Sequence, residues 1–287
     1  MPRSLSQPAP GVAVQMSNMF QMNSLVITGP SGSEGATVVV DPGWFPDEVA
    51  ELKAIAAASA AGRATHVLLT HPDFDHVVGW AEFPGAELIA HPDAARRDPM
   101  KSREDVEKLD RRCGVVRPRP YRYPPATAFS AQATLDLGCE TALLFAAPGH
   151  VGDALFTVLP ERRLLIAGDY LSDIEFPFIY HSLRDYRATL ELARRLCREY
   201  AITCAVPGHG PIAGTPAEIA RRIDTDIDYL DDLRAAVGRL HGAGASLDEA
   251  AEQLRQFSFR GAPLPPELAG EHRANIKFLY EHPDELR

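Results

Sequence analysis

Hydrophobic residues follow two patterns along the chain, short apolar runs as far as about residue 206 and a helical period in the last third. Short apolar runs that end at Gly, Pro, Asp or His are typical of buried strands. Strands are therefore predicted at 23–28, 37–41, 66–70, 141–146, 163–167 and 201–206. Residues 1–15 have a weaker pattern, which predicts a flexible or edge segment, and the Gly/Ser-rich residues 29–35 suit a hairpin turn.

Helices are predicted from apolar residues at helical spacing and from capping residues at their starts. Residues 47–60 are rich in alanine and place Val49, Leu52 and Ile55 on one face, which predicts a helix. Later helix starts are predicted where a capping box or a close variant of it begins, at Ser182, Thr215 and Ser246. Helical spacing of apolar residues follows the second of these caps, and a short helix around 266–281 is expected to close the chain.

Residues 96–130 fit neither pattern. They are charged at first and then rich in proline, with the sequence R-P-R-P-Y-R-Y-P-P. Such a segment predicts an insertion or lid with irregular backbone. The basic, aromatic stretch from Arg117 to Tyr123 is equally compatible with a contact to an anionic substrate and with a solvated loop packed by its prolines.

Composition and charge narrow the class of protein. With 287 residues, 45% of them hydrophobic, the chain can bury a large core. The formal net charge of −10 predicts an acidic surface that repels phosphate backbones, so a small molecule is a better candidate partner than nucleic acid. Nothing in the sequence indicates an oligomeric state.

Location is also constrained by the sequence. No apolar stretch approaches the roughly 20 residues of a membrane span, and the first residues lack the apolar segment of a signal peptide. The cysteines are Cys113, Cys139, Cys197 and Cys204, without a C-x-x-C pair. Reduced thiols in a cytoplasmic protein, with no membrane partner, are the expectation.

Four of the predicted strands end in a loop that contains His or Asp. These loops read H-P-D-F-D-H at 71–76, A-P-G-H at 147–150, G-D-Y at 168–170 and P-G-H-G at 207–210. If the strands belong to stacked sheets, the loops can converge on one edge. The sequence therefore predicts a polar site assembled from distant parts of the chain.

The first of these loops carries four potential metal ligands within six residues. At the end of a strand, side chains at i and i+2 point to the same side, so His71 and Asp73 can hold one ion together. The turn through Phe74 can direct Asp75 and His76 to a second ion. Imidazole and carboxylate are usual ligands of zinc, iron and manganese. Beside an apolar strand, such groups would be costly without a cation.

The order of these motifs resembles the metallo-β-lactamase superfamily, whose pattern is T-H-x-H-x-D-H followed by Gly-His, Gly-Asp and Gly-His loops. The corresponding residues are 70–76, 148–150, 168–169 and 207–210, and Asp41-Pro-Gly43 matches the short D-x-G element before the first motif. The resemblance covers roughly residues 20–240 and is highly specific. It implies an αββα sandwich of two mixed β-sheets flanked by helices, with two divalent metal ions at one edge of the sheets.

The resemblance also implies roles for individual residues. The implied ligands are His71, Asp73 and His150 for the first ion, Asp75, His76 and His209 for the second, and Asp169 as a bridge. Asp73 departs from the family pattern, which has His there. We interpret it as a harder ligand, which allows manganese or iron beside the expected zinc. A weakened first site in a single-metal protein is the alternative. Asp41 would be a turn residue or a partner that orients a ligand histidine.

Two cations that share a water lower its pKa from about 15.7 toward 7, so the resemblance implies a metal-bridging hydroxide as nucleophile. Asp75 would be the catalytic residue that orients this nucleophile and moves a proton to the leaving group. Substrate contacts are expected from the loop after Asp169, at Tyr170, Tyr180 or His181. The leading function is hydrolysis of a small ester-like substrate, which means a lactone, thioester, β-lactam or phosphodiester.

Two other functions stay open. A mono-iron oxygenase or sulfur dioxygenase on the same fold would use two His and one carboxylate, which His71, Asp73 and His150 provide. A non-catalytic metal-binding or signalling protein is the third function. In each case one domain over 1–287 is expected, with the sandwich core at 16–214, a possible lid at 96–130 and a helical C-terminal extension at 215–287.

Overall fold

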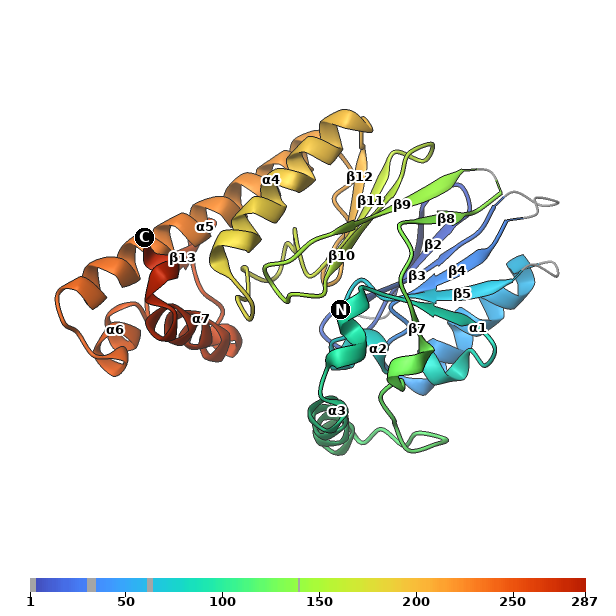
Figure 1. The fold of residues 1–287 in the computed structure, drawn as a ribbon, viewed down its shortest axis with the longest axis horizontal. Helices are drawn as coiled ribbons and strands as arrows, with labels where there is room; N and C mark the ends of the chain where they lie inside the picture. Colours follow the sequence, from blue (N-terminus) through green and yellow to red (C-terminus); the bar gives the residue numbers. More distant parts are fainter. Residues whose placement is uncertain (1–3, 30–34, 61–63, 139) are drawn as a thin grey trace.

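The fold was analysed in a computed structural model, which describes residues 4–29, 35–60, 64–138 and 140–287. Two β-sheets stack face to face, and helices lie on their outer faces (Figure 1). This arrangement is an αββα sandwich, so the fold class expected from the motifs is confirmed.

The first sheet has seven strands in sequence order. They are β1 (Ser4–Ala9), β2 (Val12–Met16), β3 (Asn23–Ile27), β4 (Thr37–Val40), β5 (Thr65–Leu68), β6 (Glu87–Ile89) and β7 (Phe129–Ser130). Neighbours are antiparallel from β1 to β4 and parallel from β4 to β7. The antiparallel pairing of β3 and β4 fits the predicted hairpin, although residues 30–34 of its turn lie outside the described part of the chain.

The N-terminal residues are more ordered than the sequence predicts. β1 is an edge strand, in agreement with one of the two expectations, but β2 is paired on both sides, with β1 and with β3. Val12 and Val14 of β2 are buried between the sheets. Polar Gln15 on the opposite face interrupts the apolar run that would have identified this strand.

The second sheet has five strands in the order β12-β11-β10-β9-β8. They are β8 (Thr134–Asp136), β9 (Thr141–Ala146), β10 (Leu155–Leu159), β11 (Leu164–Gly168) and β12 (Cys204–Pro207). The pairs are antiparallel except β11 with β12, which are parallel and are joined through a helix. Parallel neighbours need such a crossover because a tight turn cannot connect them.

The core lies in layers. Between the sheets, residues such as Ile27, Val40 and Leu68 pack against Leu144 and Ile166. A second layer covers the outer face of the first sheet, and a third covers the outer face of the second sheet. Because the central strands are buried on both faces, their sequences are continuous apolar runs without alternation.

The helices of the described residues are α1 (Pro46–Ala60), α2 (Phe74–Val77), α3 (Pro99–Cys113), α4 (Leu183–Glu199), α5 (Pro216–Gly242), α6 (Leu247–Gln253) and α7 (Ala269–Glu281). The three predicted N-caps, Ser182, Thr215 and Ser246, each accept a hydrogen bond from the backbone N–H three residues on. Only Ser246 also has the reciprocal bond of the full capping box. A small hairpin of β13 (Ser258–Phe259) and β14 (Ala262–Pro263) precedes α7.

The prediction of irregular backbone throughout 96–130 is wrong at α3. Asp98 caps this helix and Pro99 occupies its first turn. Within α3 only Val106 is buried, so the sequence offers no apolar period from which the helix can be recognised.

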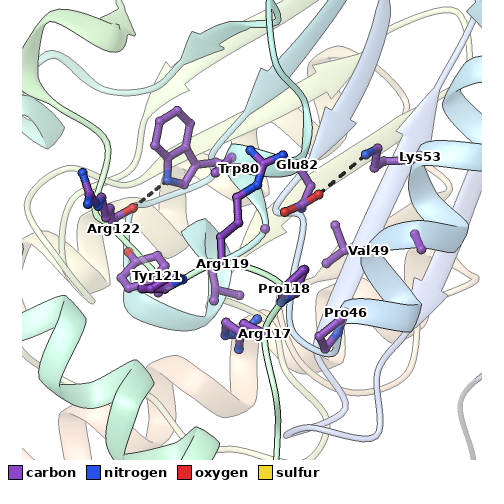
Figure 2. A pocket seen from close by; sticks show the side chains of 15 residues that line it. Pro46, Val49, Lys53, Trp80, Glu82, Arg117, Pro118, Arg119, Tyr121 and Arg122 are labelled. Atoms are coloured by element: carbon purple, nitrogen blue, oxygen red, sulfur yellow. Dashed lines mark hydrogen bonds and ion pairs between the residues drawn. The ribbon is translucent and has the colours of Figure 1, made fainter.

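The proline-rich residues after α3 are anchored by buried tyrosines, although the prolines at 118, 120 and 125 are exposed. Tyr121 is buried with Trp44, and the Arg117 guanidinium donates to both carboxylate oxygens of Asp110 and to the Trp44 carbonyl. With α1, these residues line a cavity of about 600 Å³, into which Arg119 extends (Figure 2). No predicted metal ligand lines this cavity.

Among the described residues, no helix combines the length and the apolar character needed to cross a membrane.

Candidate metal centre

All seven predicted ligands lie together at one edge of the sandwich. The loops after β5, β9, β11 and β12 bring them there from distant parts of the chain. Three groups have potential ligand atoms within 4.8 Å of one another, namely His71, Asp73 and His150; His71, His76 and Asp169; and Asp75, His76 and His209. The two triads expected from the sequence are both among them.

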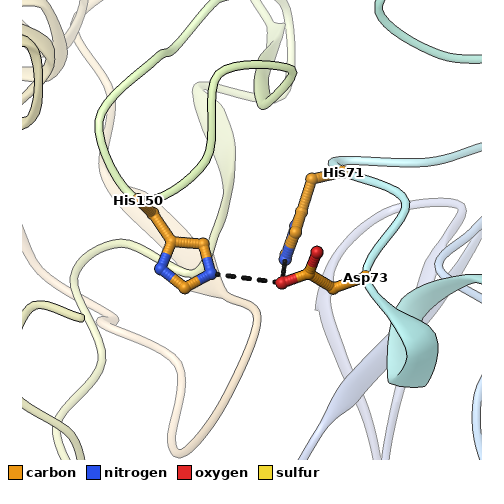
Figure 3. Close-up of side chains that lie close together, drawn as sticks. All are labelled: His71, Asp73 and His150. Carbon is orange, nitrogen blue, oxygen red and sulfur yellow. Dashed lines mark ion pairs between the residues drawn. The ribbon is translucent and has the colours of Figure 1, made fainter. Parts of the chain in front are cut away.

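The side chains of the first triad point toward one another at separations typical of metal ligands (Figure 3). The Nε2 atoms of His71 and His150 lie 3.5 and 3.6 Å from Asp73 Oδ2. They lie 3.6 and 3.4 Å from Asp169 Oδ2. Ligands about 2.0–2.2 Å from a tetrahedral ion are roughly 3.3–3.6 Å apart, so these separations match such a site.

The second triad has similar dimensions. His76 Nε2 and His209 Nε2 lie 3.3 Å apart, and Asp75 Oδ2 lies 3.8 and 3.4 Å from them. Asp169 Oδ1 is 3.1 Å from His76 Nε2 and 3.4 Å from His209 Nε2. The two oxygens of Asp169 therefore face different triads, which is the arrangement of a bridging carboxylate.

Each of the four imidazoles uses Nδ1 for a contact outside the centre and directs Nε2 inward. The Nδ1 contacts are His71 with Thr70 Oγ1 at 3.2 Å, His76 with Asp41 Oδ2 at 2.9 Å, His150 with Phe178 O at 2.9 Å and His209 with Phe20 O at 3.0 Å. Such outer contacts fix the orientation of a metal-binding ring.

The donor atoms suit a cation. His71 Nε2 and His150 Nε2 are buried and have no hydrogen-bond partner within the described residues. Desolvation lowers the pKa of His209, but the carboxylates of Glu175, Asp169 and Asp75 outweigh it and raise this pKa to about 10. The carboxylates thus favour a positive charge at this position, which a divalent ion would supply. Nitrogen and carboxylate donors in this number fit zinc, manganese or iron.

The local backbone explains how residues 71–76 contribute side chains to both triads. The carbonyl of Asp73 accepts hydrogen bonds from the backbone N–H groups of His76 and Val77, both at 3.1 Å, and so starts the single turn of α2. Asp73 precedes this turn in extended conformation, whereas Asp75 and His76 lie inside it. The turn rotates these two side chains away from the first triad.

Of the three expected substrate contacts, the structure brings Tyr180 to the centre. Tyr180 lines a cavity of about 490 Å³ beside Asp73, with Arg97, Lys101 and Tyr123 on its wall. Its hydroxyl donates to Glu271 Oε2 at 2.5 Å.

Tyr170 and His181 lie elsewhere. Tyr170 is buried, and its hydroxyl donates to Ala147 O at 2.7 Å and accepts from the backbone N–H of His150 at 3.0 Å. It therefore holds the loop of a predicted ligand and does not line the cavity. The exposed His181 pairs with Asp185 at 3.5 Å outside the cavity.

Three residues at the centre have no counterpart in the sequence predictions. Arg97 donates to Asp73 Oδ1, and Asp153 accepts from Arg97. Glu175 lines a small cavity with His150 and Asp169, and desolvation raises its pKa to about 7. No motif in the sequence marks Arg97, Asp153 or Glu175.

Comparison with known proteins agrees with the class of protein that this fold and site define. The family model of the Metallo-beta-lactamase superfamily matches residues 18–209. The chain therefore belongs to the metallo-beta-lactamase superfamily, as an enzyme of the metallo-hydrolase class.

Individual relatives are distant. A hydroxyacylglutathione hydrolase of Acidiphilium cryptum (strain JF-5) is 29% identical over 251 residues, which cover 85% of this chain and 89% of the relative. A metallo-beta-lactamase family protein from Thermus thermophilus aligns with a TM-score of 0.61 at 20% identity, over 98% of this chain and 94% of its own. A metallo-beta-lactamase from Pontibacter korlensis aligns with a TM-score of 0.54 at 16% identity, over 79% and 99%. These structural similarities concern the fold alone.

Proposed function

We propose that this enzyme is a dinuclear metal-dependent hydrolase of a small ester-like substrate, with Asp73, Asp75, Asp169 and the four histidines as ligands. The observation that carries the proposal is the position of Asp169, whose two carboxylate oxygens face two separate triads. Zinc is the expected metal, and the oxygen donor of Asp73 extends the choice to manganese and iron.

When bound, two such ions supply an acidified water as nucleophile and polarise the substrate oxygen. The side chains of this chain do the rest. Asp75, whose Oδ2 lies 3.4 Å from His209 Nε2 in the second triad, would orient the attacking water, and its other carboxylate oxygen would carry the proton to the leaving group. The cavity beside Asp73 admits the substrate, and Val151 and Tyr180 contribute apolar surface to its wall.

Among the candidate substrates, which are lactones, thioesters, β-lactams and phosphodiesters, we place thioesters first. The relative from Acidiphilium cryptum is named for hydrolysis of a hydroxyacyl group on glutathione, and it aligns over 85% of this chain. The cavity of about 490 Å³ is large enough for a small molecule of this kind.

The other functions make different use of the same residues. A mono-iron oxygenase would need only His71, Asp73 and His150, whereas the second triad is as closely spaced as the first. A non-catalytic metal-binding protein would not need a cavity beside the ligands. Both features support the dinuclear hydrolase.

Metal analysis tests the proposal directly. Gently purified protein should contain two transition-metal ions per chain, and a chelator should abolish hydrolysis and lower the melting temperature, because bound ions stabilise the folded state. His209→Ala should remove hydrolysis and one ion but keep the fold, since this ligand lies on a loop. His181→Ala, outside both triads, should keep both ions.

The assay should compare a thioester, a lactone, a β-lactam and a phosphodiester. A metal content that stays at one ion per chain after supplementation would contradict the dinuclear centre. Activity that disappears under anaerobic conditions would identify an oxygenase instead.

A further inference from the structure

Arg97 connects the unusual ligand position to the segment that follows β6. It lies between the short 3-10 helix η2 (Pro92–Arg96) and α3. Its Nη1 atom donates to Asp73 Oδ1. Its Nε and Nη2 atoms donate to the two oxygens of Asp153, at 2.8 and 2.5 Å. One guanidinium thus joins two carboxylates.

Because of this contact, the two carboxylate oxygens of Asp73 have different partners. Oδ1 accepts from Arg97, while Oδ2 faces His71 Nε2 and His150 Nε2 at 3.5 and 3.6 Å. The guanidinium gives Asp73 Oδ1 one charge-assisted hydrogen bond, and its two parallel bonds to Asp153 fix the direction of that bond, which an ammonium cannot do. Asp73 is therefore held with one oxygen toward the first triad.

Asp153 holds Arg97 in turn. The Asp153 side chain is only 7% exposed, and it accepts hydrogen bonds from the two guanidinium nitrogens that do not contact Asp73. Arg97 is itself 26% exposed and lines the cavity beside the centre. The direction of the guanidinium is thus fixed by a buried group and not by solvent.

An imidazole at position 73 would not suit these surroundings. A histidine ligand needs an acceptor for its second ring N–H, as the other imidazoles of the centre illustrate. At position 73 the neighbouring group is Nη1 of Arg97, which donates hydrogen bonds and cannot accept one from an imidazole N–H. Arg97 is therefore compatible with Asp at position 73 but not with the His of the family pattern.

We propose that Arg97 is a positioning residue that makes Asp73 a one-oxygen ligand of the first metal ion. The inference rests on the proposed metal centre and adds a residue that neither the motif nor the family match assigns. Metal affinity at the first triad is then a joint property of positions 73 and 97.

The test is metal binding, measured by competition with a chelator, so that it needs no substrate. In Arg97→Gln, the affinity for one of the two ions should fall about 10- to 100-fold, the usual effect of removing the partner of a ligand. The affinity for the other ion should stay within about twofold of the wild-type value, because its ligands keep their partners. Arg97→Lys, which keeps the charge but not the fork, should give only partial recovery.

Arg117→Gln is the matched control. Arg117 donates to both oxygens of Asp110 at 2.7 and 2.8 Å and to the Trp44 carbonyl at 2.9 Å, and no predicted ligand is among its partners. This variant loses the same kind of fork, so any general destabilisation should be comparable. Both metal affinities should be unchanged in it.

A double variant separates a loss of metal affinity from a failure to fold. Arg97→Gln leaves the buried Asp153 carboxylate without its cation, which can prevent folding. Combining it with Asp153→Asn removes that charge while Asp73 still lacks its guanidinium. The loss of affinity for one ion should persist in this double variant.

A mutant cycle with Asp73→His tests the pairing itself. In the wild-type background, Asp73→His should weaken binding of the first ion, because the new ring faces Arg97. In the Arg97→Gln background, the same change should restore at least part of the lost affinity, since a glutamine can accept a hydrogen bond.

The outcomes separate this inference from the proposed function. Wild-type protein that binds fewer than two ions would overturn the metal centre itself. Two ions in the wild type, with both affinities unchanged in Arg97→Gln, would overturn the role of Arg97 alone. Equal effects of Asp73→His in the two backgrounds would overturn the pairing.

Discussion

Asp41 has a backbone φ of 46°, in the left-handed region that non-glycine residues rarely adopt. In this conformation its carboxylate accepts hydrogen bonds from the backbone N–H and the hydroxyl of Thr70, at 2.8 and 2.6 Å. His76 Nδ1 donates to Asp41 Oδ2 at 2.9 Å. One buried carboxylate therefore fixes both the start of the first motif and a ring of the second triad. This agrees with the interpretation of Asp41 as a partner that orients a candidate ligand histidine.

Asp41→Asn should weaken both functions of this residue. The amide keeps one acceptor oxygen and presents an NH2 group to donors, so His76 loses its orientation. We expect metal affinity to fall about 10- to 100-fold and the free energy of unfolding to fall by about 1–3 kcal/mol. Chelator competition and denaturant unfolding measure the two effects.

Asp93→Asn is the control, because Asp93 belongs to a second H-P-D sequence, at 91–93, on the surface. This variant should bind metal like the wild type. If Asp41→Asn also binds metal like the wild type, Asp41 is a turn residue only.

At the scale of residues, the sequence indicates the candidate ligands better than the residues that hold them. Residues such as His71 and His209 are recognisable because they follow a known order of motifs. Arg97 lies in the sequence Arg96-Arg-Asp98, where nothing distinguishes it from a surface charge. Its contact with Asp73 exists only because the chain returns to the centre after β6, and no local pattern encodes that return.

Among the secondary-structure elements, α3 has the most direct relation to the cavity. Its first turns place Lys101, Ser102 and Asp105 on the wall of the cavity that Tyr180 also lines. After α3, Tyr121 and Tyr123 pack into the core, whereas the prolines at 118, 120 and 125 are exposed. The segment predicted as a lid thus contains a helix that faces the cavity and a proline-rich part anchored by two buried tyrosines.

Lys101→Ala should therefore affect binding more than stability. For an anionic substrate we expect KM to rise about two- to fivefold, the effect of losing one exposed charge contact. The melting temperature and kcat should change little, since Lys101 is 80% exposed. Steady-state kinetics and thermal unfolding measure these quantities.

Arg103→Ala is the matched control on the same helix. Arg103 is 56% exposed, pairs with Glu107 and does not line the cavity. An equal change of KM in the two variants would mean that α3 has only a general electrostatic influence on the substrate.

Burial explains part of how well an element can be predicted. Strands such as β4 and β11, buried on both faces, and helices with N-caps lie close to their predicted bounds. The pattern misses β2 because polar Gln15 interrupts it, and α3 because a single buried residue leaves no period. It also misses the central strand β10, although all five of its residues are buried.

In the whole molecule, the C-terminal helices reach back to the substrate side of the centre. Asn275 of α7 accepts from the backbone N–H of Ile179 at 2.8 Å and donates to the carbonyl of Pro177 at 2.7 Å. Glu271 of the same helix accepts from Tyr180. The sequence predicts a helix near this place but does not show which loop it contacts.

Asn275→Ala should uncouple this loop from α7. The buried backbone groups of residues 177 and 179 would lose their partners, at a cost of about 1–3 kcal/mol in the free energy of unfolding. Because Tyr180 lies on the same loop, KM should rise more than kcat falls. Denaturant unfolding and steady-state kinetics provide the measurement.

Lys277→Ala, an exposed change on the same helix, should alter neither quantity. A loss of stability without any change in KM would limit α7 to a structural role.

The proposed ligands come from both sheets, and this has a consequence for the newly made protein. Each proposed triad takes two residues from the loop after β5 and its third from the second sheet, His150 for one and His209 for the other. A nascent chain that has emerged only as far as the first sheet therefore contains neither complete triad. Asp169 and then His209 follow later in translation, so the proposed centre would be complete only after the strands of the second sheet have been made.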